Sequence, residues 1–188
     1  RLKDAVERYA AALNGREEWL VSSFVCPVDS LAELGDVLTG VEGLDYFPVA
    51  AVGARSSSKG EWEDALESAV EAMNAFDRRM GDRAGIEGFE VRIPDCGGIA
   101  QYIRDLGGFA EADVFVEVPW DPAGPDALAA IAGTDWLFAK ARTGGLEPSA
   151  FPTPFELGSF VRNCVDLELP FKLTAGLHHA LPRWDETV

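Results

Sequence analysis

Six short apolar runs divide the chain at fairly regular intervals, and each is followed or preceded by a segment with helical spacing. The runs cover residues 19–25, 47–54, 89–94, 114–119, 136–142 and 171–175. Their apolar residues are continuous rather than alternating, which is typical of parallel strands that are buried on both faces. The pattern therefore predicts six strands that alternate with helices.

The segments between the runs carry helix signals. After the serines at 56–58, the residues Trp62, Leu66, Ala69, Met73 and Phe76 form one apolar stripe, which predicts a long amphipathic helix with a buried face. Thr153 with Glu156, and Ser30 with Glu33, have the spacing of a capping box, so we expect helices to begin at both places.

Alternating strands and helices fit either an open doubly wound sheet or a (β/α)8 TIM barrel. No strand is followed by a glycine-rich nucleotide-binding loop, which argues against the open sheet. Polar residues recur near the ends of consecutive strands, where barrels place their chemistry: Arg92, Glu117, Lys140, Arg142, Lys172 and Thr174. We favour a single TIM-barrel-like domain over residues 1–188. Because six strands cannot close a barrel of eight, we expect it to be incomplete at both ends and to belong to a longer chain.

The amino-acid composition excludes several classes of binding partner and site. The formal net charge of −16 argues against binding to nucleic acid or to an anionic membrane, since both require a cationic surface. Three widely spaced cysteines fit reduced thiols better than a disulfide framework or a zinc site. No apolar run reaches the ~18 residues of a spanning helix. We therefore predict a cytoplasmic protein without a metal or cofactor, and its oligomeric state, including a homo-oligomer, stays open.

Two strand ends carry a motif that resembles a known enzyme family. The segments Lys140-Ala-Arg-Thr-Gly144 and Lys172-Leu-Thr-Ala-Gly176 are similar to the active-site strand ends of class I aldolases of the deoxyribose-phosphate aldolase type. The chain as a whole also resembles bacterial proteins of unassigned function, which have similar Arg-Thr-Gly-Gly and Phe-Lys-x-Thr-Ala-Gly-Leu-His-His stretches. The aldolase resemblance implies a barrel in which these two lysines lie on strands six and seven.

It also implies a lyase that forms a Schiff base with a small anionic metabolite bearing a carbonyl group. Lys140 would be the nucleophile and Lys172 the neighbouring cation that favours its neutral form, which attack on a carbonyl requires. Glu117, if it points inward, would relay protons or neutralise a lysine. Arg92 and Arg142 would contact the anion.

Two other interpretations use the same residues. Arg92, Glu117, Lys140 and Lys172 can form a buried network of salt bridges that only fills the barrel centre. Alternatively, Lys140, Lys172, Arg142 and the backbone amides of Gly144 and Gly145 can hold a phosphate or carboxylate without covalent chemistry. We place Thr143, Thr174 and His178 among the substrate-binding candidates in addition. His178 and His179 are the two histidines of the chain, and at most one of two neighbouring extended residues can face the site.

Overall fold

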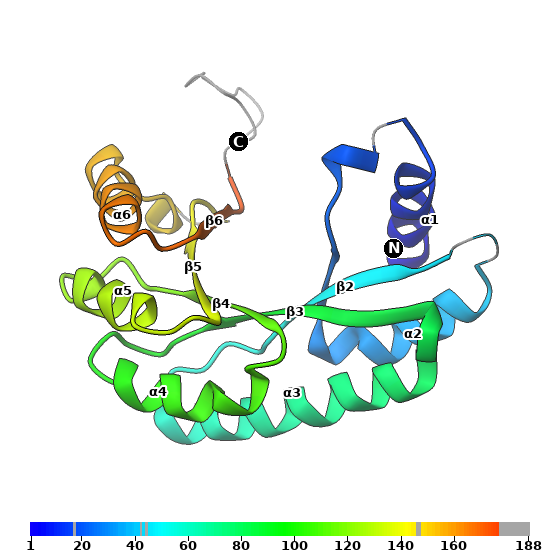
Figure 1. The fold of residues 1–188 in the computed structure, drawn as a ribbon, viewed down its shortest axis with the longest axis horizontal. Helices are drawn as coiled ribbons and strands as arrows, with labels where there is room; N and C mark the ends of the chain where they lie inside the picture. The colour runs from blue at the N-terminus through cyan, green and yellow to red at the C-terminus, as the bar shows by residue number, and fades with distance from the viewer. Residues whose placement is uncertain (17, 42, 44, 146–147, 177–188) are drawn as a thin grey trace.

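The protein is an α/β fold in which six parallel strands alternate with helices and curl into an open half-barrel (Figure 1). A computed structural model describes residues 1–16, 18–41, 43, 45–145 and 148–176. The strands are β1 (Phe24–Pro27), β2 (Phe47–Val52), β3 (Ala84–Arg92), β4 (Asp113–Glu117), β5 (Leu137–Arg142) and β6 (Phe171–Thr174). They pair in chain order from β1 to β6, and every pairing is parallel. The predicted alternation of strands and helices is confirmed.

The helices lie along the outside of the curled sheet, except that α1 lies near the β1 end (Figure 1). They are α1 (Leu2–Leu13), α2 (Leu31–Thr39), α3 (Lys59–Met80), α4 (Ile99–Asp105), α5 (Gly124–Ala132) and α6 (Pro154–Asp166). The apolar stripe of α3 is buried as predicted, and it includes Trp62, Leu66 and Phe76. Within the part of the chain that the structure describes, no helix is both long and apolar enough to cross a bilayer.

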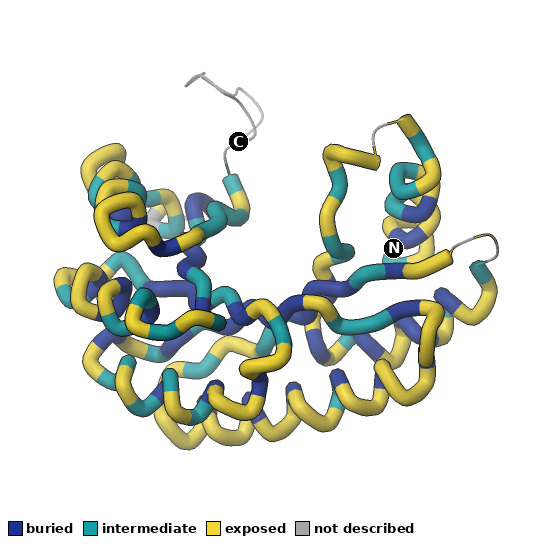
Figure 2. The backbone as a smooth tube through the Cα atoms, in the orientation of Figure 1, coloured by how far each residue is buried: buried dark blue, intermediate teal, exposed yellow. Residues whose placement is uncertain are grey.

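The core lies between the outer face of the sheet and these helices (Figure 2). Successive residues of a strand point to opposite faces, so every second residue reaches this core. Val91, Val116 and Ala139 do so from three adjacent strands, and all are buried. Their neighbours in sequence therefore point to the inner, concave face.

Two predicted strand boundaries were wrong. Residues 18–20 form a 3₁₀ turn that leaves Trp19 and Leu20 exposed, and the first strand runs from Phe24 to Pro27 instead. It is the pairing of Phe24 with Val49 that places this strand, and an apolar run alone does not reveal its partner. The third strand begins at Ala84 rather than residue 89, because pairing with β2 extends it through a glycine-containing stretch.

The two predicted capping boxes had different outcomes. At α6 the Thr153 hydroxyl accepts a hydrogen bond from the Glu156 backbone, and the Glu156 side chain accepts one from the Thr153 backbone, so this box is confirmed. At α2 the Ser30 side chain makes no capping hydrogen bond. A 3₁₀ turn over Val28–Ser30 leads directly into that helix, and Ser30 has nearly helical backbone angles instead of the extended ones of a capping residue.

Candidate functional site

Four ionisable side chains form one cluster on the concave face, which we call the inner cluster: Glu90, Glu117, Lys140 and Lys172. The Lys140 ammonium nitrogen lies 2.9 Å from a Glu90 carboxylate oxygen and 2.7 Å from one of Glu117. The other oxygen of Glu90 accepts a hydrogen bond from Lys172 at 2.5 Å. Lys140 is thus held between two carboxylates, and Glu90 joins the two lysines.

The register of the sheet brings these side chains together from four strands. Arg92 of β3 lies opposite Glu117 of β4, which lies opposite Lys140 of β5, which lies opposite Lys172 of β6. Adjacent strands are ~4.8 Å apart, so a row of this kind places charged groups within contact distance. Glu90 points to the same face from two residues earlier in β3 and reaches both lysines.

Burial increases toward the centre of the inner cluster. The side chains of Glu90, Glu117 and Lys140 are only 4%, 7% and 6% exposed, respectively. Lys172 is 29% exposed, and Arg92, whose nitrogen lies 3.9 Å from Glu117, is 40% exposed. Buried charges are stable only when they are paired, and here each buried charge has an opposite partner.

The pKa of Glu90 reflects this balance. Burial by itself would raise the pKa of its carboxyl group, but the hydrogen bond from Lys172 and the charge of Lys140 more than offset burial and lower the pKa below its ordinary value. Glu90 is therefore ionised at neutral pH despite its burial.

An apolar layer lies beside the inner cluster. In the sheet register Phe115 is opposite Glu90 and Phe138 is opposite Phe115, and the two aromatic rings are 5.2 Å apart. The Lys172 ammonium group lies over the Phe115 ring, 3.9 Å from its centroid, in a cation–π contact. Lys172 is thus oriented by a carboxylate and an aromatic ring together.

The sequence predicted Arg92, Glu117, Lys140 and Lys172 as neighbours, and the structure brings them together. It differs in what lies between the lysines: the aldolase resemblance implied that Lys172 is a neighbouring cation of Lys140, whereas the Glu90 carboxylate bridges the two ammonium groups. We did not single out Glu90 from the sequence. Glu90 lies two residues before Arg92 in the otherwise apolar run 89–94, so the two side chains share a face, and this spacing was the signal that could have found it.

Arg142 and Thr143 make local contacts at the end of β5. The Arg142 guanidinium donates to the Gly144 carbonyl at 2.9 Å, and the Arg142 carbonyl accepts from the Trp120 indole at 3.1 Å. The Thr143 hydroxyl is buried and donates to the Ala175 carbonyl, and the Thr143 amide donates to the Thr174 carbonyl at 2.8 Å. The Thr143 contacts join the ends of β5 and β6 next to the inner cluster.

Gly144 occupies a position where the backbones of β5 and β6 nearly touch. A β-carbon on Gly144 would lie 2.9 Å from the α-carbon of Gly176, which is closer than ordinary packing allows. Gly176 has a φ of 68°, a conformation that glycine adopts most easily. Both glycines therefore have a packing role at this junction, whatever else they do.

Thr174 lies two residues after Lys172 on the same strand, so both side chains point to the same face. Its hydroxyl oxygen is buried and makes no hydrogen bond to any described residue. A buried hydroxyl without a partner is costly. His178, our other substrate-binding candidate in this region, lies outside the described residues.

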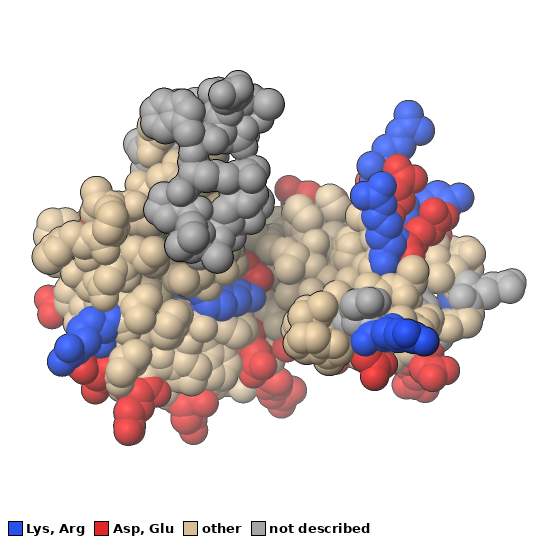
Figure 3. Space-filling model, turned by 90° about the horizontal axis from the view of Figure 1, so that it is seen from above, with Lys and Arg blue, Asp and Glu red and all other residues tan. Residues whose placement is uncertain are grey.

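The open side of the sheet is hollowed between its two ends, as seen from above in Figure 3. Among the described residues no group of three or more histidine, cysteine, aspartate or glutamate side chains is arranged to hold a metal ion. No family model, curated protein or solved structure matches the chain. The resemblance to class I aldolases therefore stays a prediction that depends on the two lysine motifs.

Proposed function

We propose that the concave face binds a small metabolite that carries a phosphate or carboxylate group. The observation that carries this proposal is an excess of positive charge: with Arg92, the inner cluster contains three cations and two carboxylates. A local excess of cations stands out in a protein of net charge −16 and favours the binding of an anion.

The exposed members of the cluster are the groups that would contact the anion. Glu90, Lys140 and Glu117 form its buried centre, whereas Lys172 and Arg92 reach the open side. A guanidinium and an ammonium group together supply donors suited to phosphate or carboxylate oxygens.

Thermal unfolding with inorganic phosphate tests the proposal. About 10 mM phosphate should raise the melting temperature by about 3–5 °C relative to chloride at the same ionic strength, if Kd is about 1 mM. Arg92→Gln and Lys172→Met, made as separate variants, should each abolish this rise. Arg162→Gln is the matched control, because Arg162 is an exposed cation paired with Asp166 on α6, away from the sheet. Equal loss in the control, or no rise with the unaltered protein, contradicts the proposal.

A second candidate function is a lyase that forms a Schiff base at Lys140. Its support is the 2.7 Å contact between Lys140 and Glu117, because a carboxylate at this distance can accept the proton that the ammonium group must lose. The amine would then attack a substrate carbonyl and release water to form an imine. The closed (β/α)8 barrel that the aldolase resemblance implies is proposed together with this activity.

Borohydride trapping separates the two candidates. Glyceraldehyde should form an imine with Lys140, and sodium borohydride should reduce this imine to a stable secondary amine. Mass spectrometry should then locate the added mass on Lys140. Lys59, an exposed lysine of α3, serves as the internal reference for nonspecific reaction. An adduct on Lys59 but not on Lys140 would contradict the lyase function and leave anion binding as the remaining candidate.

A further inference from the structure

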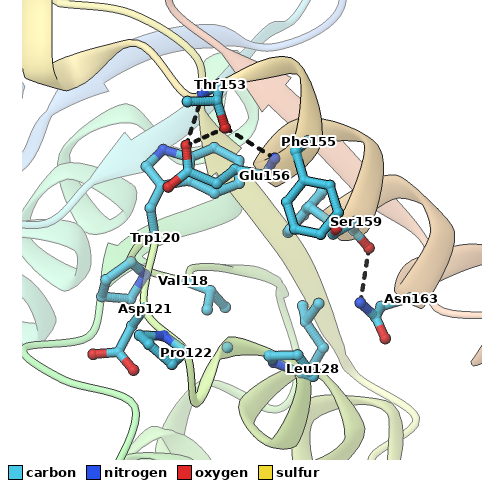
Figure 4. Close-up of a pocket in the computed structure, with 14 residues that line it drawn as sticks. Val118, Trp120, Asp121, Pro122, Leu128, Thr153, Phe155, Glu156, Ser159 and Asn163 are labelled. Carbon is cyan, nitrogen blue, oxygen red and sulfur yellow. Dashed lines mark hydrogen bonds between the residues drawn. The ribbon is translucent and has the colours of Figure 1, made fainter.

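A cavity of about 650 Å³ lies between the loop after β4 and the first half of α6 (Figure 4). It lies on the helix side of the sheet. Val118, one of its lining residues, has the same parity as Val114 and Val116, which face the helices, whereas Glu117 faces the inner cluster. Its volume falls in the range of small-molecule sites. The cavity is thus separate from the site of the proposed function.

The walls of the cavity are mainly aromatic and aliphatic. Trp120 is on one side and Phe155 and Leu128 are on the other (Figure 4), and Phe160 lies 6.0 Å from Trp120, centroid to centroid. Phe155 is 82% exposed although its ring lines the cavity. An exposed ring beside an open apolar cavity leaves hydrophobic area that a ligand with an apolar body would cover.

The charged groups that line the cavity are acidic. Asp121 uses one carboxylate oxygen to accept from the Ala123 amide, and Glu156 uses one to accept from Thr153. Within the described residues no hydrogen bond uses the other oxygen of either carboxylate. None of the described residues that line the cavity is basic. An anion would be repelled here, whereas a cation would meet two carboxylates and three aromatic rings.

We propose that this cavity binds a small organic cation with an aromatic or other apolar body, such as an aryl ammonium compound. The rings of Trp120, Phe155 and Phe160 would pack against the apolar body of the ligand, and their faces would contact its cationic group. Asp121 and Glu156 would balance its charge. The net charge of −16 favours approach of a cation from solution.

Isothermal titration calorimetry with phenyltrimethylammonium tests the proposal, and benzenesulfonate serves as a probe of similar size and opposite charge. We expect the cation to bind about tenfold or more tightly than the sulfonate. Asp121→Asn and Glu156→Gln should each weaken cation binding by about threefold to tenfold, and Phe155→Ala by about tenfold. The asparagine keeps the acceptor for the Ala123 amide, and glutamine is compatible with a capping box, so both variants should fold.

Two control variants lie close to the cavity but do not line it. Asp126→Asn removes a carboxylate from the first turn of α5, and Phe151→Ala removes an exposed ring before α6; both should bind the cation like the unaltered protein. Equal binding of the two probes, absence of cation binding, or equal losses in the controls would overturn the proposal. So would self-association that Phe155→Ala abolishes in sedimentation velocity, because the ring would then belong to an interface between two copies.

Discussion

The two faces of strands β3 to β5 differ in charge, although their residues alternate along the same chain: the inner face carries ion pairs and the outer face does not. On the outer face Val91, Val116 and Ala139 are buried among helices, and on the inner face Arg92, Glu117 and Lys140 form ion pairs. The outer face is stabilised by removing apolar area from water, whereas the inner face has to balance buried charges. Substitutions on the outer face should therefore destabilise the protein by leaving cavities, and substitutions on the inner face by leaving buried charges without partners.

The largest effect is expected from Lys140→Met, which leaves Glu90 and Glu117 buried without their shared cation. Breaking a buried ion pair from one side costs about 3–5 kcal/mol of unfolding free energy, which urea denaturation would measure. The triple variant Glu90→Gln, Glu117→Gln and Lys140→Met should recover much of that loss, because it removes the uncompensated charges. A loss below about 1 kcal/mol in the single variant would show that the carboxylates are solvated.

On the outer face, Leu137→Ala should cost about 2–4 kcal/mol, since Leu137 is almost fully buried and the substitution leaves a cavity. The phosphate response should persist, because the inner cluster is unchanged. Urea denaturation and the phosphate-dependent melting shift, measured on the same variant, check both expectations. Val165→Ala, at an exposed position of α6, should cost about 0.5 kcal/mol or less. Loss of the phosphate response in Leu137→Ala would contradict the separation of the two faces.

The pH dependence of stability should report on Glu90. Its pKa is lower in the folded protein than the ordinary value of 4.5, so the unfolded chain binds more protons and stability falls as pH drops through the acidic range below about 4.5. Glu90→Gln should flatten this part of the stability curve, measured by urea denaturation between about pH 3 and pH 6. Glu87→Gln provides an exposed control on the same strand. An unchanged slope in Glu90→Gln would mean that the carboxylate is not held by the two lysines.

Among the substitutions in the inner cluster and Arg92, the smallest effect on stability is expected from Arg92→Gln. Its contact with Glu117 is 3.9 Å long and its side chain is 40% exposed, so the cost should stay below about 1 kcal/mol. The phosphate-dependent melting shift should nevertheless disappear. A large loss of stability together with a normal phosphate response would assign Arg92 to the framework instead of the proposed site.

Much of the candidate site could be predicted because strand parity is a local property. Lys140 and Arg142, or Lys172 and Thr174, share a face by their spacing alone, and polar residues near the ends of buried strands are conspicuous. Partner choice could not be predicted in the same way. Glu90 reaches two strands beyond its own pairing partner β4, and its contact with Lys172 depends on how far the sheet curls.

The cavity beside Trp120 was also beyond sequence reasoning. Its residues come from the loop after β4, from α5 and from α6, and in the chain they appear as an ordinary proline-containing turn and a helix start. Phe155 has the sequence context of a capping box, where an aromatic residue signals nothing about a cavity. Only the packing of α6 against the loop places its ring opposite Trp120.

The amino-acid sequence by itself determined the alternation of strands and helices, the capping box at α6 and the apolar stripe of α3, because each depends on residues close together in the chain. The tertiary structure decided the true start of β1 and β3, the bridging position of Glu90 and the cavity at α6. These features depend on register, curl and helix placement, which are set by the packing energy of the whole core and not by any one segment.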